Sequence, residues 1–175
     1  MKKWITLTLT IVMILSITIT ASASSPSPTA DNITFVTSED GQRQSLLVYR
    51  IKTTDETKKL IETFLLAYGE GNVFSVFPEE IEIDSNAIIL DVISLAAEKE
   101  AADYESYTIL IKGALGILKD YPAYAILKAD DNWMQPQAEA VEDDVLRVTF
   151  DQDTLKKMVD AKNISLVIIR GEIAE

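Results

Sequence analysis

The chain of 175 residues contains no cysteine and no histidine. Without cysteine it forms no disulfide, and iron–sulfur clusters and blue-copper sites are excluded. Without histidine it lacks the usual general base at neutral pH, and the Ser-His-Asp and Cys-His arrangements that activate a nucleophile are excluded. A zinc site would have to use carboxylates alone, which zinc rarely accepts. Carboxylates are therefore the only side chains that we expect to support catalysis.

The N-terminal residues have the three parts of a secretory signal peptide. Lys2 and Lys3 precede an uncharged segment, 4–20, that is rich in Ile, Leu, Val and Thr. Ala21 and Ala23 then supply the small side chains that a signal peptidase requires, so we predict cleavage after Ala23. The alternative is a retained membrane anchor, which the uncharged segment is barely long enough to form. The sequence predicts a secreted or extracellular protein with no membrane insertion after cleavage.

The chain that remains after cleavage is strongly acidic. Without Lys2 and Lys3, 28 acidic residues face 14 basic ones. This negative field argues against binding nucleic acid or an anionic membrane surface, and it favours solubility or attraction to cations or a basic partner. We divide the chain into the Pro/Ser linker 24–31, an extension at 32–80 and a main domain at 81–175.

The extension is predicted to contain a β-hairpin and a helix. Strand candidates at 33–36 and 45–52 flank the turn signal Asp40-Gly41. A helix should follow the second of these strands. The extension would then be a hairpin-plus-helix unit attached to the main domain.

The spacing of Thr53 and Glu56 is that of a capping box and predicts where this helix begins. Gly69 and Gly71 predict where it ends. Apolar residues recur on one face, which we interpret as core packing against a sheet: Leu60, Ile61, Phe64, Leu65 and Tyr68.

The main domain contains a series of short strand candidates. They are 87–95, 105–113, 121–128, 133–141, 145–150 and 164–169. The last is apolar on both faces and is predicted to be central, and a second helix at 152–161 is predicted to begin after an N-cap at Asp151. The pattern favours an immunoglobulin-like β-sandwich in a protein that is mainly β and α+β overall. The alternative is an α+β roll in which the first helix packs on one mixed sheet.

Several motifs follow one another between Phe77 and Ile169. They are Phe77-Pro78-Glu79-Glu80, the turn Asp131-Asn132-Trp133, the acidic hairpin 141–144, the segment 148–158 and the closing strand 164–169. With the signal peptide and linker before them, they resemble a group of uncharacterised exported proteins of Firmicutes with small β-sandwich bodies. The resemblance covers about 74–170 and implies a sandwich fold. No functional residues come with it.

Acidic loops are candidates for a calcium site, because calcium prefers hard oxygen ligands on loops. None of the loops has EF-hand spacing, and the alternative is that their acids are solvated turn residues and a helix cap. The candidate ligands are Asp130, Asp131, Glu142, Asp143, Asp144, Asp151 and Asp153.

Aromatic residues are candidates for a sugar-binding platform. Trp133, Tyr121 and Tyr124 are the candidate binding residues, with Tyr104 and Tyr107 as further members. The alternative is that they are ordinary strand residues packed in the fold.

We therefore predict an exported non-enzymatic binding or structural module without a required cofactor, whose partner is a protein or a glycan. The alternative is a small carboxylate-dependent hydrolase acting on glycans, which would need two acids facing each other across a cleft. A binding module instead needs an exposed aromatic or apolar patch.

Overall fold

The computed structural model describes residues 35–38, 46–83, 86–113 and 120–171. Its strands form two sheets in which paired strands run antiparallel. The four-stranded sheet has the order β1 (Phe35–Ser38), β4 (Ser106–Lys112), β8 (Val145–Asp151), β7 (Gln137–Glu142). The five-stranded sheet has the order β2 (Val48–Arg50), β3 (Ile88–Ala97), β9 (Ile164–Arg170), β5 (Ala123–Ala129), β6 (Asn132–Met134).

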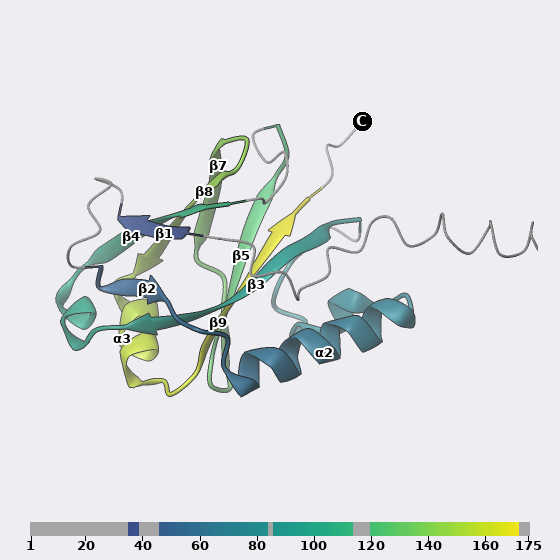
Figure 1. The fold of residues 1–175 in the computed structure, drawn as a ribbon, viewed down its shortest axis with the longest axis horizontal. Coiled ribbons are helices and arrows are strands. Elements are labelled where there is room, and N and C mark those ends of the chain that lie inside the picture. The colour runs from purple at the N-terminus through teal and green to yellow at the C-terminus, as the bar shows by residue number, and fades with distance from the viewer. Residues whose placement is uncertain (1–34, 39–45, 84–85, 114–119, 172–175) are drawn as a thin grey trace, which may run out of the picture.

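Helices occupy the edges and one outer face of these sheets. They are α2 (Asp55–Gly69), α3 (Gln152–Asp160) and the 3₁₀-helices η1 (Val73–Val76) and η2 (Lys99–Asp103). In Figure 1, α2 runs along the outside of the five-stranded sheet. Helix α3 contacts η2, β3, β4 and β8. The protein is therefore mainly β and α+β overall, as predicted, but its described strands form two antiparallel sheets, not the single mixed sheet of the alternative.

The inner core lies between the two sheets. Successive side chains of a strand face opposite sides, so alternate residues of each strand enter it. On β8 these are Leu146, Val148 and Phe150, all fully buried, which confirms the predicted alternation. We define the inner core by its buried residues: Val48, Ile93, Leu95, Ala101, Ile109, Ile111, Ala125, Leu127, Leu146, Val148, Phe150, Leu155, Met158, Ile164, Leu166 and Ile168.

The outer core lies on the other face of the five-stranded sheet, beneath α2 and η1. It consists of Leu60, Phe64, Phe77, Ala87, Val92, Ile126, Val167 and Ile169. The two cores meet at β9. Its Leu166 and Ile168 side chains lie in the inner core, and its Val167 and Ile169 side chains lie in the outer core. Strand β9 therefore has no wet face, and its central place in the sheet confirms the prediction for 164–169.

The predicted N-terminal hairpin is wrong. Strand β1 pairs with β4 in one sheet, and β2 pairs with β3 in the other. Val48 on β2 is fully buried in the inner core, and Val36 on β1 packs against the same core. Pairing the two segments with each other would forgo these contacts, so the local turn signal does not decide the pairing. Residues 33 and 34 of the first predicted strand lie outside the described residues.

Two other predictions differ from the structure. The segment predicted as one strand at 133–141 is divided between β6 and β7, which belong to different sheets. Pro136 lies between them, and proline cannot donate the hydrogen bond that an interior strand position needs. The N-cap of α2 is Thr54 and not Thr53, whereas Asp151 caps α3 as predicted.

Candidate binding surface

Buried hydroxyl groups attach the first turn of α2 to the five-stranded sheet. The Oγ1 atom of Thr57 lies 2.7 Å from Ser94 Oγ on β3 and 2.7 Å from Ser165 Oγ on β9. Thr57 and Ser94 are fully buried, and Ser94 faces Ser165 across the β3–β9 pair. A buried hydroxyl without a partner costs about 1–3 kcal/mol. Because each hydroxyl supplies a partner to another, the cluster fixes the point at which α2 crosses the sheet.

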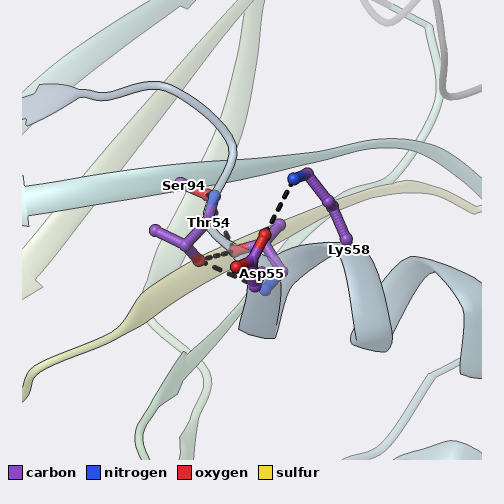
Figure 2. A network of polar contacts seen from close by, with 5 residues as sticks. Thr54, Asp55, Lys58 and Ser94 are labelled. Atoms are coloured by element: carbon purple, nitrogen blue, oxygen red, sulfur yellow. Dashed lines mark hydrogen bonds and ion pairs between the residues drawn. The ribbon is translucent and has the colours of Figure 1, made fainter.

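The N-terminus of α2 is held by a second set of polar contacts (Figure 2). Thr54 Oγ1 accepts a hydrogen bond from the backbone N–H of Thr57 at 3.2 Å, and the Thr54 N–H donates to Ser94 Oγ at 3.0 Å. Asp55 and Lys58 form an exposed ion pair at 2.8 Å, which lowers the pKa of Asp55 and raises the pKa of Lys58. This end of the helix is therefore capped and anchored.

Aromatic contacts fix the middle of α2. Leu60 and Phe64 point into the outer core, and the ring centroid of Phe64 lies 5.2 Å from that of Phe77. The ring of Phe77 also meets Trp133 edge-on at 5.4 Å. The helix, the segment after η1 and strand β6 thus pack as one layer, and the α2 backbone is positioned by both hydroxyl and aromatic contacts.

Beyond Phe64, α2 has no buried residue. Leu65 is 50 %, Leu66 73 % and Tyr68 61 % exposed. The expectation that Leu65 and Tyr68 belong to the core-packing face is therefore wrong, because the outer core ends at Phe64 while the helix continues to Gly69. We refer to Leu65, Leu66 and Tyr68 as the α2 patch.

The members of the α2 patch cover a broad part of the helix surface. Leu65 and Tyr68 are three residues apart and lie on neighbouring turns, whereas Leu66 is rotated by about 100° from Leu65 and by about 160° from Tyr68. Gly69 completes the surface without a side chain, and a Cβ added there would meet no atom within 4 Å. The helix ends just after it, where Gly71 takes a φ of 74°. An incoming side chain could therefore reach the helix backbone at this point.

The surroundings of the α2 patch are acidic. Glu62 is three residues from Leu65 and four from Leu66, and Glu70 is four residues from Leu66, so both are neighbours of the patch. Both are exposed. Seven acidic residues and no Lys or Arg lie between Leu60 and Glu98, whereas the exposed Lys58 and Lys59 lie one helical turn before Glu62. The negative end of the helix dipole adds to this field at Glu70. We refer to Glu62 and Glu70 as the acidic rim.

The predicted aromatic residues make different contacts in the fold. Trp133 packs against Phe77, and Tyr124 packs against the outer core on the same face of the five-stranded sheet. The ring of Tyr121 contacts Arg170, whose guanidinium carbon lies 4.6 Å from the ring centroid. Tyr104 and Tyr107 form a separate edge-on pair at 6.1 Å. A sugar-binding role for Trp133, Tyr121 and Tyr124 stays a prediction.

The predicted calcium ligands lie in three separate turns. Asp130 and Asp131 lie between β5 and β6, and Asp151 and Asp153 lie at the start of α3. Glu142 is the last residue of β7, and Asp143 and Asp144 form the β7–β8 turn. No group of three acidic residues that could hold a metal ion is found in the described part of the chain. Calcium binding stays a prediction.

Two of these carboxylates accept backbone hydrogen bonds. Asp130 accepts from the N–H groups of Lys162 and Asn163 at 3.1 and 3.0 Å, which lower its pKa. Asp151 accepts from the N–H of Thr154 at 2.8 Å, which lowers its pKa likewise. Hydrogen bonds to the ionised form have this effect. A general acid needs a raised pKa, so neither group is suited to that role. Both groups instead hold a turn or a helix end through their hydrogen bonds.

The sequence reasoning missed the α2 patch, although two signals point to it. Phe64, Leu65 and Leu66 are consecutive, and three consecutive apolar residues cannot all lie on one side of a helix, because each is rotated by about 100° from the last. The second signal is the acidic segment without Lys or Arg. Together they mark an apolar helix surface within a negative field.

The predicted cleavage residues, Ala21 and Ala23, and the linker 24–31 lie outside the described residues. Within the described ranges, no helix is long and apolar enough to cross a membrane. Comparison with known proteins finds no matching family model, curated protein or solved structure. The resemblance to exported Firmicutes proteins stays a prediction.

Proposed function

We propose that this protein is exported and acts, outside the cytoplasm, as a non-enzymatic binding module that contacts a protein partner through the α2 patch. The observation that carries the proposal is the exposure of Leu65, Leu66 and Tyr68 on a helix that is anchored on its other side. Covering apolar surface gains about 25 cal/mol per Å² removed from water. Adjacent exposed apolar side chains therefore favour association with a partner.

The anchoring of α2 supports this proposal because a rigid binding surface loses little conformational entropy on association. Thr57 is tied to β3 and β9 by hydroxyl contacts, and Phe64 is held by Phe77. The α2 patch follows directly after these fixed points. Its backbone is therefore in place before a partner arrives.

Three carboxyl groups whose pKa is displaced are unsuited to act as the general acid of a hydrolase. Asp55, Asp130 and Asp151 all have their pKa lowered by hydrogen bonds or a neighbouring Lys. A carboxylate hydrolase needs one acid whose pKa is raised, so that it keeps its proton at neutral pH. The pKa values of these three groups are lowered instead: Asp55 pairs with Lys58, Asp130 holds a turn and Asp151 caps α3.

An immunoglobulin-like classification of the sandwich is part of the same proposal. Its support is the presence of two antiparallel sheets of four and five strands packed around one apolar core. An experimental structure compared strand by strand with immunoglobulin-like domains would test it. A strand connectivity unlike theirs would remove the classification and leave the binding proposal intact.

The binding proposal is tested by photo-crosslinking in the native host. A photoreactive amino acid replaces Leu66 in the full-length chain, and in a matched control it replaces Asp143, which is exposed in the β7–β8 turn. We expect a discrete crosslinked species from position 66 and none from position 143. Equal labelling from both positions, or none from position 66, would overturn the proposal. Export is tested separately by N-terminal sequencing of protein from the medium, which we expect to begin after Ala23.

A further inference from the structure

We infer that the partner of the α2 patch is a short basic amphipathic segment, with one or two apolar side chains flanked by Lys or Arg. This inference rests on the proposed binding function and specifies its partner. The apolar part of the segment would cover Leu65, Leu66 and Tyr68, and its basic side chains would meet the acidic rim.

The charge around the α2 patch indicates the sign of the charge that its partner carries. Glu62 and Glu70 border the patch, and they lie in a segment without Lys or Arg from Leu60 to Glu98. Two further exposed acids, Glu79 and Glu80, follow Phe77, whose ring contacts Phe64 beneath the helix. Complementary charge speeds encounter and excludes wrong partners. A basic segment fits this rim, and an acidic one is repelled.

The same charges argue against a second copy of the chain as the occupant. Two α2 patches in contact would bring two acidic rims together, in a protein that carries 28 acidic residues against 16 basic ones. Like charges placed opposite each other in an interface are destabilising. An anionic membrane surface is disfavoured for the same reason. A glycan is less suited, because two of the three side chains are aliphatic and sugar rings prefer aromatic faces.

The size of the α2 patch limits the interface. Three side chains on about one helical turn cannot supply the area of a standard stable complex, and contacts of this size belong to weak, transient complexes. Gly69, which lacks a side chain and has open space above it, permits a close approach of the partner. We therefore expect a dissociation constant of about 1–100 μM.

The inference is tested with three labelled synthetic peptides of equal length. One has Leu at helical spacing with Lys elsewhere, the second replaces each Lys by Glu, and the third is a scrambled Leu/Lys peptide without amphipathic spacing. Fluorescence anisotropy with the purified protein measures binding at about 30 mM and about 500 mM salt, between which screening of exposed charges becomes severe. We expect binding of the amphipathic basic peptide alone, weakened about tenfold at high salt.

Matched variants separate the α2 patch from general negative charge. Glu62→Lys combined with Glu70→Lys should weaken binding of the basic peptide about tenfold. Asp143→Lys combined with Asp144→Lys makes the same change in net charge at the β7–β8 turn, and it should change the affinity less than twofold. Leu65→Ser combined with Leu66→Ser should abolish measurable binding while the far-UV circular dichroism spectrum is retained.

Several outcomes would overturn the inference. They are equal binding of the scrambled peptide, equal effects of the two charge reversals, binding of the acidic peptide, and a dimer in sedimentation that Leu66→Ser dissolves. Binding to anionic vesicles that needs Leu66 would also overturn it. If position 66 crosslinks a discrete partner while the basic peptide fails to bind, the binding proposal stands and this inference alone fails. If neither occurs, both fail.

Discussion

The inner and outer cores lie on opposite faces of one sheet, yet they are built differently. Residues of the inner core are at most 3 % exposed, because a second sheet and α3 cover them. In the outer core Leu60, Phe64 and Phe77 retain 5 to 8 % exposure beneath a single helix and a 3₁₀-helix. A second sheet covers a whole face, whereas a helix covers only a stripe. The outer core is thus the side on which the fold presents a helix to solvent.

Removing a large side chain from the inner core should have the largest effect on stability. Phe150→Ala leaves a gap where the ring is fully buried between the sheets. Because rigid surroundings collapse poorly around a cavity, we expect a loss of about 4–5 kcal/mol in the free energy of unfolding, measured with urea. A loss below about 2 kcal/mol would show that the inner core relaxes around a cavity as readily as the outer core does. The proposed difference between the two cores would then be wrong.

The corresponding change in the outer core should cost less and act locally. We expect Phe64→Ala to lose about 3 kcal/mol, because the helix can settle toward the sheet. Trp133, the only tryptophan after Trp4, reports on this layer through its contact with Phe77. In this variant its fluorescence transition should come at a lower urea concentration than the far-UV transition. Coincident transitions, like those expected for Phe150→Ala, would mean that both cores unfold as one unit.

A substitution in the hydroxyl cluster under α2 should have the next largest effect on stability. Thr57→Val keeps the shape of the side chain but removes the hydroxyl that pairs with Ser165 and accepts from Ser94, which keeps only its contact with the Thr54 N–H. We expect a loss of about 1–3 kcal/mol in urea denaturation, since buried hydroxyls would be unsatisfied. Adding Ser165→Ala, which removes the other hydroxyl left unpaired, should recover part of it. A double variant that is no more stable than Thr57→Val would show that the pairing of Thr57 with Ser165 does not anchor the helix.

Asp151 should stabilise the protein by an amount that depends on pH. Its pKa is lowered in the fold, so the ionised form stabilises the protein above the ordinary Asp value of about 3.9, and the contribution is lost as the pH falls through the lower folded-state value. Asp151→Ala should lose about 1 kcal/mol at pH 7, and this difference from wild type should shrink toward pH 3. Asp151→Asn, which retains a capping oxygen, should lose less at pH 7. Equal effects of the Ala variant at both pH values would exclude the charge as the cause.

The smallest stability effect is expected on the exposed side of α2. Leu66→Ser should change the free energy of unfolding by no more than about 0.5 kcal/mol, because the side chain is 73 % exposed. Leu60→Ser on the same helix, where the side chain is 8 % exposed, should lose several times as much. Urea titrations of the two variants make the comparison. Equal losses would mean that the α2 patch packs within the protein.

Elements whose pattern is local were predictable from the sequence. The apolar run 164–169 and the alternation of Leu146, Val148 and Phe150 follow from which faces of a strand are covered. The Asp151 cap depends only on the three residues after it. The helix end at Gly69 is local in the same sense.

Features that depend on distant partners were not predictable. Strands β1 and β2 join different sheets because each pairs with a strand much later in the chain. Strand β1 pairs with β4, and β2 pairs with β3. The adjacent threonines Thr53 and Thr54 are equally good caps, and contact with Ser94 selects the second. The exposure of Leu65 and Tyr68 depends on where the sheet stops beneath α2, which no periodicity within the helix reveals. The consecutive apolar residues Phe64, Leu65 and Leu66 indicate that one of them is exposed, but the fold decides which.

The central place of β9 governs when the molecule can assemble. Both β3 and β5 find a neighbour in β9, and both cores draw on its side chains. A nascent chain that ends before Ile164 therefore has the two flanking strands but nothing to bridge them. Such an intermediate should be readily cleaved by proteases and easily unfolded by pulling on the chain. Both cores should then close in a single late step, once β9 has been synthesised.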